Sequence, residues 1–207
     1  MMFQKMALLA VLALGGCSMT RYETPPYTVD LAEGHLEVRT YAPHLVADVT
    51  VTGPQDQALG DGFSILADFI FGNNKGRQSV AMTAPVTQQA APEPIAMTTP
   101  VTQQAAAEEG TWTVRFVMPS SYTMDTLPTP NDSRVKIHQE PARRFAAIRF
   151  SGFWSEASYA ARRAELETFM TAKNLKAAGT PPVSAYYNPP FTLPFLRRNE
   201  VLIELAR

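Results

Sequence analysis

The 207-residue chain contains one cysteine, three histidines and no excess of either charge. A single cysteine excludes an internal disulfide and every metal site built on paired cysteines. The histidines, His35, His44 and His138, have neither the His-x-His nor the His-x3-His spacing of a local metal site. Because 18 Lys and Arg nearly balance 19 Asp and Glu, the formal charge is −1, which argues against a nucleic acid partner.

Signatures of catalysis are also missing from the sequence. It contains no HExxH motif, no glycine-rich phosphate loop and no Ser/His/Asp set in a recognisable context. We therefore expect a protein that is not an enzyme. The composition, 45% hydrophobic and 18% charged, is that of a globular protein with enough chain for one ordinary domain.

The apolar run near the start, residues 6–14, is too short to span a bilayer, which takes about 20 residues. Its length and the preceding Lys5 are typical of a secretory signal. The run leads into Leu-Gly-Gly-Cys at residues 14–17, which resembles the bacterial lipoprotein box, whose cysteine receives lipid and becomes the mature N-terminus. The alternative is an ordinary signal peptide with a chance cysteine. Ser18, rather than an Asp, follows the cysteine, and this resembles the signal for sorting to the outer membrane.

These features divide the chain into three parts. We predict a signal peptide over residues 1–16, a lipidated N-terminus at Cys17 with a spacer up to residue 33, and one folded domain over residues 34–207. The expected location is the cell envelope, on the periplasmic face of the outer membrane. The membrane is then a partner through the N-terminal lipid anchor.

Hydrophobic spacing in the body predicts an α+β fold. Alternation with period two indicates strands, and apolar spacing of three and four indicates two helices, over residues 59–71 and 156–174. The order strand, strand, helix, strand, strand occurs twice, in residues 35–118 and 134–205. Two similar ββαββ halves predict a distorted antiparallel barrel or curved sheet with two packed helices.

The first predicted helix is apolar over most of its circumference. Its polar residues are confined to Asp61, Ser64 and Asp68, so we expect it to be buried on more than one side. A ligand cleft between such a helix and the sheet is a common outcome.

A segment of twelve residues is duplicated in the middle of the chain. Residues 80–91 (VAMTAPVTQQAA) recur as residues 95–106 (IAMTTPVTQQAA). Two copies are too few for a solenoid. The copies could form a hairpin or successive edge strands over the cleft, or one copy could be a loop duplication without a role.

Five segments carry a family resemblance: residues 62–74 (GFSILADFIFGNN), 81–86 (AMTAPV), 116–120 (FVMPS), 187–190 (YNPP) and 198–201 (RNEV). Together they resemble the SOUL haem-binding protein family. The resemblance covers residues 29–206 and is strongest in the MTAPV and RNEV segments. It implies an α+β barrel with two helices that binds haem or a related tetrapyrrole in an apolar cleft beside the first helix. That helix is also the one with surplus apolar surface, so both arguments meet at Phe63, Leu66, Ala67 and Ile70.

The resemblance brings no axial haem ligand with it. In some animal members a histidine follows the arginine of the first strand, and that position is Thr40 here. His44, at the turn after this strand, is the remaining candidate for a weak axial ligand, although a lone turn histidine is more often solvated. Met82 and Met97 are soft donors that more often pack in a core. We therefore expect binding by apolar burial without a strong axial bond.

Cations for the tetrapyrrole propionates are scarce. The first predicted helix offers only Asp61 and Asp68, so the nearest candidates are Lys75 and Arg77, just past the helix. Arg197 and Arg198 are further candidates, and for each of these residues taken singly a solvated loop charge is the favoured interpretation. Glu200 could be a functional carboxylate, but an exposed or arginine-paired structural role is favoured.

The sequence thus supports two hypotheses. The first is an envelope lipoprotein that binds haem, another tetrapyrrole or another flat apolar ligand. The second is a structural, stress or protein-interaction lipoprotein that does not bind haem and whose cleft is filled by its own side chains.

Overall fold

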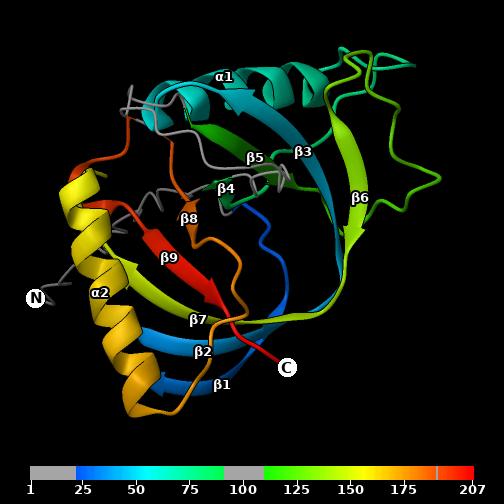
Figure 1. Ribbon diagram of the computed structural model, residues 1–207. Helices are drawn as coiled ribbons and strands as arrows, with labels where there is room; N and C mark the ends of the chain where they lie inside the picture. The colour runs from blue at the N-terminus through cyan, green and yellow to red at the C-terminus, as the bar shows by residue number, and fades with distance from the viewer. Residues whose placement is uncertain (1–21, 91–109, 190) are drawn as a thin grey trace, which may run out of the picture.

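The computed structural model describes residues 22–90, 110–189 and 191–207. In these residues the strands form one antiparallel sheet that curls into an open barrel (Figure 1). The predicted α+β class is therefore confirmed. The elements are β1 (Tyr27–Glu33), β2 (Leu36–Tyr41), β3 (His44–Thr52), α1 (Gln55–Ile70), β4 (Val86–Ala90), β5 (Thr111–Val117), β6 (Lys136–Glu140), β7 (Arg143–Phe150), α2 (Glu156–Ala172), β8 (Val183–Tyr186), η1 (Pro194–Leu196) and β9 (Asn199–Glu204).

The strand order shows the two predicted halves. It runs β1-β2-β7-β9-β8-β4-β5-β3-β6. Beyond β1, this order reads the same from either end once β2 is matched to β6, β3 to β7, β4 to β8 and β5 to β9. The domain is therefore a pseudo-twofold pair of ββαββ units that have exchanged their first strands. We call the part of the sheet around α1 the first lobe and the part around α2 the second lobe. β2 lies in the second lobe, and β6 in the first.

The two halves meet where two long strands are interrupted. β2 pairs with β7 up to Tyr41↔Arg143, and β3 pairs with β6 from His44↔Glu140, in one continuous register. The interruption contains Pro43 on one side and Pro141 on the other. Since proline has no N–H, neither position can donate a ladder hydrogen bond, and the chain passes there from one lobe to the other.

The sheet begins earlier than predicted. Residues up to 33 were expected to form a spacer, but β1 pairs with β2 along its whole length and adds an edge strand. The alternation of apolar and polar residues that indicates a strand is weak in β1, because most of its side chains, except those of Tyr27 and Leu31, are exposed. Every strand, helix and core cluster of the described residues lies between Tyr27 and Leu205.

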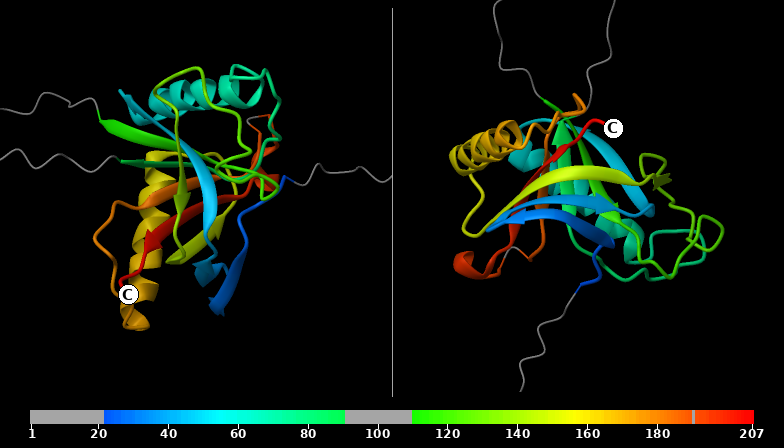
Figure 2. Two further views of the ribbon diagram at one scale, coloured as in Figure 1. Left: turned by 90° about the vertical axis from the view of Figure 1, so that its right-hand side faces the viewer. Right: turned by 90° about the horizontal axis from the view of Figure 1, so that it is seen from below.

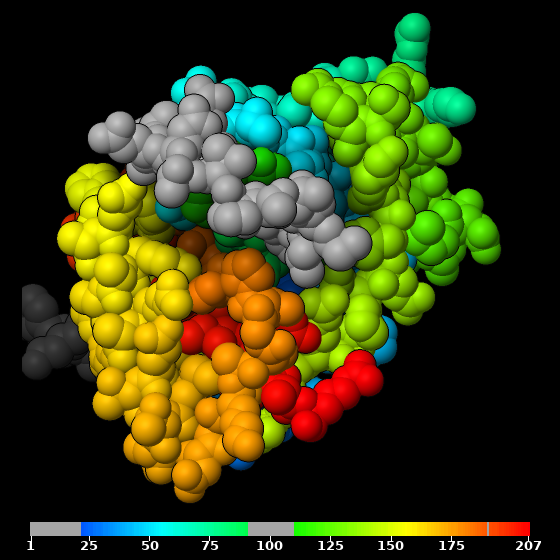
Figure 3. Space-filling view, viewed as in Figure 1, coloured from blue at the N-terminus to red at the C-terminus, as the bar shows by residue number. Residues whose placement is uncertain are grey.

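Both helices pack against the same face of the sheet. α1 lies against β3 and β5, and α2 lies against β7 and β9 (Figure 2). α2 buries only Leu166, Phe169 and Met170, so its outer side forms part of the molecular surface (Figure 3). Ser155 is the N-cap of α2, and its side chain accepts a hydrogen bond of 3.1 Å from the backbone N–H of Ser158.

The opposite face of the sheet carries no helix in the described residues. Its strand positions alternate with the core positions and combine charged groups, such as Arg39 and Glu200, with a small apolar cluster around Tyr41 and Leu202. The candidate site lies on this side and at the adjoining strand ends.

Candidate functional site

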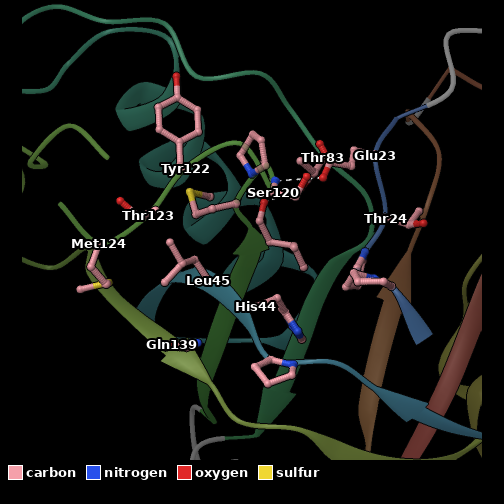
Figure 4. Close-up of a pocket in the computed structure, with 16 residues that line it drawn as sticks. Glu23, Thr24, His44, Leu45, Thr83, Ser120, Tyr122, Thr123, Met124 and Gln139 are labelled. Carbon is pink, nitrogen blue, oxygen red and sulfur yellow. Dashed lines mark hydrogen bonds between the residues drawn. The ribbon is translucent and has the colours of Figure 1, made fainter. Parts of the chain in front are cut away.

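Two adjoining cavities lie at the junction of the halves. They share Pro25, His44 and Val117, and we refer to them together as the central pocket. The larger cavity, about 330 Å³, lies at the start of β3 and the end of β5, and Figure 4 shows the residues that line it. The smaller, about 80 Å³, lies on the helix-free face between the two lobes. Small-molecule sites typically span about 300–1,000 Å³, so the larger cavity is at the lower end of that range.

The lining of the larger cavity comes from three segments, together with Thr83 and Gln139. Residues 23–26 form one wall, residues 43–45 form the floor at the start of β3, and residues 117–124 form the other wall. These segments are held together by the backbone N–H of Ser120, which donates to Glu23 Oε1 at 2.9 Å (Figure 4), and by the Thr83 hydroxyl, which donates to the Val117 carbonyl. The side chains that face the cavity include apolar and soft groups, among them Leu45, Met118 and Met124.

His44 lines both cavities, and its hydrogen bond fixes its tautomer. Nδ1 lies 2.8 Å from the Ala42 carbonyl oxygen. A carbonyl can only accept, so Nδ1 carries the proton, and in the neutral ring Nε2 keeps its lone pair. Histidines that bind metals or haem iron usually have the same arrangement, with the non-ligating nitrogen donating to a carbonyl or carboxylate. The predicted candidate therefore lies in the pocket with a suitable donor atom.

The cations of the smaller cavity are already paired. Arg115 donates to both carboxylate oxygens of Asp48, at 2.7 and 2.6 Å, and lies 3.0 Å from Glu140. Arg143 lies 3.0 Å from Glu140 and 3.3 Å from Glu204. Burial opposes ionisation of Glu140, but Arg115, His138 and Arg143 together outweigh it and lower the pKa of this carboxyl. These arginines are thus engaged before any anionic ligand arrives.

A second charged cluster lies in the other lobe, around Glu200. Arg39 donates to both oxygens of Glu200, at 2.7 and 3.0 Å, and both residues are almost fully buried, at 2% and 1% exposure. Arg198 and the Tyr187 hydroxyl add bonds of 2.8 Å to the same carboxylate. Burial opposes ionisation of Glu200, but hydrogen bonding and charge from Arg39 outweigh it and lower the pKa of the carboxyl. The arginine-paired interpretation of Glu200 is confirmed, and its structural role follows from the fully bonded carboxylate.

The residues predicted to line a cleft beside α1 do not do so. Leu66 and Ile70 are 0% and 1% exposed and belong to the core between α1 and the sheet. Ala67 is also buried, whereas Phe63 is at the surface with its ring 5.3 Å from that of Phe116. The prediction of a cleft was wrong for Leu66 and Ile70 because the surplus apolar surface of α1 packs against its own sheet.

The predicted propionate contacts are not brought together. Lys75 and Arg77 are exposed in the loop after α1 and line none of the cavities described here. Arg198 is bound to Glu200 and stacks over Tyr187 at 3.9 Å. Cys17 lies outside the described residues.

The other donors weighed in the sequence have ordinary roles. His35 bonds to Glu165 at 2.7 Å near the surface, and His138 bonds to Glu140 at 3.0 Å. Met82 packs against the core under α1, and Met97 lies outside the described residues. Within residues 22–90, 110–189 and 191–207, no three His, Cys, Asp or Glu side chains gather as a metal site.

The duplicated segment has a defined place in its first copy only. Val86–Ala90 forms β4, an inner strand between β5 and β8. The first copy is thus a structural strand rather than an edge over a cleft. The second copy, residues 95–106, lies outside the described residues.

Sequence reasoning missed most of the central pocket. Pro25, Val117 and Tyr187 come from segments that are distant in the sequence and that only the pairing of the strands brings together; β4, for example, pairs with both β5 and β8. The signals available in the sequence were the two proline interruptions and the lone histidine next to one of them. No helix within the described ranges is long and apolar enough to cross a membrane.

The fold and the pocket define a class: small pseudo-twofold α+β barrels with a pocket at the junction of the repeats. The chain belongs to the SOUL heme-binding protein family, whose sequence pattern matches residues 22–204. It is 28% identical to heme-binding protein 1 of Mus musculus over 77% of this chain and 78% of that protein. It is 29% identical to heme-binding protein 2 of Homo sapiens, over 59% and 55% respectively.

Solved structures share the fold at low sequence identity. The C-terminal domain of EcmrR has a TM-score of 0.58 at 9% identity and covers 87% of this chain and 98% of that domain. A hydrolase from Listeria innocua has a TM-score of 0.55 at 14% identity and covers 86% and 94%. At these identities the likeness shows the fold alone.

Proposed function

We propose that the domain binds haem or a related tetrapyrrole in the central pocket, with His44 in its wall. The observation that carries this proposal is the His44 geometry: Nδ1 donates to the Ala42 carbonyl, so Nε2 retains its lone pair. The pocket around it has a mixed lining, in which Leu45, Met118 and Met124 stand beside polar residues. Family membership and the names of the two heme-binding relatives support it.

The pocket suits part of a flat macrocycle rather than full enclosure. A cavity of about 330 Å³ accepts one edge of the ring, with Leu45 and Met118 against it. Arg115 and Arg143 are held by carboxylates, so the propionates would point toward solvent. Apolar burial would then supply most of the affinity, and His44 would be the residue that holds the haem iron, through Nε2.

We also propose that the protein is located in the cell envelope and that it is not an enzyme. The leader pattern at residues 14–17 supports lipidation of Cys17 and a domain tethered on the periplasmic face of the outer membrane. The domain is proposed to capture a ligand without converting it and without binding nucleic acid. Incorporation of labelled palmitate into the wild-type chain, and its loss in Cys17→Ala, would test the anchor.

Titration with hemin tests the binding step. Because all described elements lie between residues 27 and 205, residues 18–207 are expected to fold, and hemin should produce a saturable Soret shift with quenching of Trp112 or Trp154 fluorescence. His44→Ala should change the Soret position more than the affinity. His35→Ala is the matched control, since His35 is exposed and outside the central pocket, and it should behave as wild type.

A second candidate function rests on the packing of α1. Leu66 and Ile70 close the space in which the ligand cleft was expected, which favours a structural or protein-interaction role. If hemin gives neither a Soret shift nor saturable quenching, this alternative replaces the first proposal.

A further inference from the structure

Exposed apolar side chains gather at one end of the second lobe. Five of the nine exposed large hydrophobic residues of the described chain belong to two neighbouring segments, and we call these five the apolar tip. The segments are joined by a hydrogen bond of 2.9 Å from the Gly152 N–H to the Pro194 carbonyl. Around η1 the chain projects from the lobe, at lower left in the right-hand view of Figure 2. The five residues are Phe153, Phe191, Leu193, Phe195 and Leu196.

An arginine-rich cavity adjoins the tip. It has a volume of about 390 Å³, and its charged lining is His35 and Arg149, Arg162, Arg197 and Arg198, with no acidic residue. Arg162 pairs with Glu165 and Arg198 with Glu200. The Arg149 side chain is exposed and has no ion pair among the described residues.

Arg197 connects the cavity to the tip. Its guanidinium lies over the Phe153 ring at 4.8 Å, and its Nε donates to the Thr192 carbonyl at 2.8 Å, within the segment that carries Phe191 and Phe195. Apolar side chains and guanidinium groups are therefore presented side by side. The chain as a whole is nearly neutral, so this concentration of positive charge is local.

We propose that the apolar tip and the arginine-rich cavity dock the domain on a membrane surface that contains anionic phospholipid. Aromatic and leucine side chains enter the boundary between head groups and acyl chains. Each guanidinium group can bind two oxygens of one lipid phosphate. The first described residues (dark blue) emerge on the same side of the molecule as η1 in the right-hand view of Figure 2, so a membrane there would face both. This contact is independent of haem binding and additional to any lipid anchor.

Vesicle flotation of residues 18–207 tests the proposal without an acyl chain. We expect binding to vesicles of phosphatidylcholine and phosphatidylglycerol in equal parts, and weak binding to phosphatidylcholine alone. Phe195→Ser should reduce partition about tenfold, the effect of losing one inserted aromatic side chain. Arg149→Gln should reduce it about fivefold on the anionic vesicles.

Matched controls come from other parts of the surface. Phe71 is 68% exposed, close to the 71% of Phe195, and Phe71→Ser should leave partition unchanged. Arg77→Gln is the corresponding control for Arg149→Gln. Absence of flotation, equal binding to both vesicles, or an equal loss in Phe71→Ser would overturn the proposal. Dimers that form in solution through the apolar tip, without flotation, would also overturn the proposal. In that case the apolar tip would bind a second copy of the chain rather than a membrane.

Discussion

At the scale of single residues, the pair of Arg39 and Glu200 shows how a charged residue can occupy a buried strand. Two strands far apart in the sequence, β2 and β9, present these side chains on one face, and Arg39 Nε also donates to Glu37 at 2.6 Å. Each charge is acceptable only because the other is present, since an isolated buried charge is strongly destabilising.

Removing one partner should therefore be costly. Glu200→Gln removes the buried counter-charge of Arg39 and leaves only the more exposed Glu37 as its anionic partner, so we expect the free energy of unfolding to fall by about 3–5 kcal/mol. Glu167→Gln is the control, because Glu167 makes an exposed ion pair with Arg163 on the surface of α2. This substitution should change the free energy of unfolding by about 0.5 kcal/mol or less. Urea unfolding of both variants measures the difference, and similar losses in the two would contradict the structural role of the pair.

The lowered pKa values of Glu200 and Glu140 predict the acid side of the stability curve. A carboxyl whose pKa is lower in the folded than in the unfolded state stabilises the fold above its unfolded value, about 4.3, and loses that contribution as the pH falls through the folded pKa. The free energy of unfolding should be flat near neutral pH and fall below about pH 4. Urea titrations at a series of pH values should show a shallower fall for Glu140→Gln, and a parallel curve would refute the assignment.

His44 shows how much of the candidate site could be predicted from single residues of the sequence. A lone histidine beside a proline turn could be identified as a candidate, but the hydrogen bond to Ala42 that leaves Nε2 as the donor atom depends on the turn geometry. The Arg39–Glu200 pairing likewise depends on a strand order that no local pattern specifies.

At the scale of elements, α1 explains the main error of the sequence interpretation. A helix with an almost continuous apolar surface predicts burial on several sides, and both a ligand and the protein core can provide that burial. In the structure the core provides it, because Gly62 allows the helix to lie close against Val114 of β5: a Cβ added at Gly62 would be 2.5 Å from Val114 Cγ2.

Two glycines in α1 should respond in opposite ways to the same substitution. Gly60→Ala meets open space and should stabilise the protein by about 0.5–1 kcal/mol, because alanine is the better helix former. Gly62→Ala gains the same propensity but forces α1 away from β5, and should destabilise the protein by about 1–3 kcal/mol. Thermal unfolding of the pair checks this, and a stabilising Gly62→Ala would show that the helix is not tightly packed there.

At the scale of the whole molecule, the sequence predicted the halves but not their exchange. Period-two alternation and two helical stretches were enough for the ββαββ repeat, because these signals are local. The crossing of β2 and β6 depends on pairing between residues about a hundred positions apart, such as His44↔Glu140, and this crossing creates the central pocket. The fold class could therefore be predicted from local patterns, but the position of the pocket could not, because it depends on pairing between distant residues.

The bound ring has two alternative positions in this domain, the central pocket and the face of α1. Amide chemical-shift mapping of isotope-labelled residues 18–207 with metal-free protoporphyrin IX measures the position directly, since this ligand leaves the signals sharp. We predict shifts in residues 43–45 and 117–124, around His44, with little change in residues 59–71. Shifts confined to residues 59–71, or none at all, would contradict binding in the central pocket.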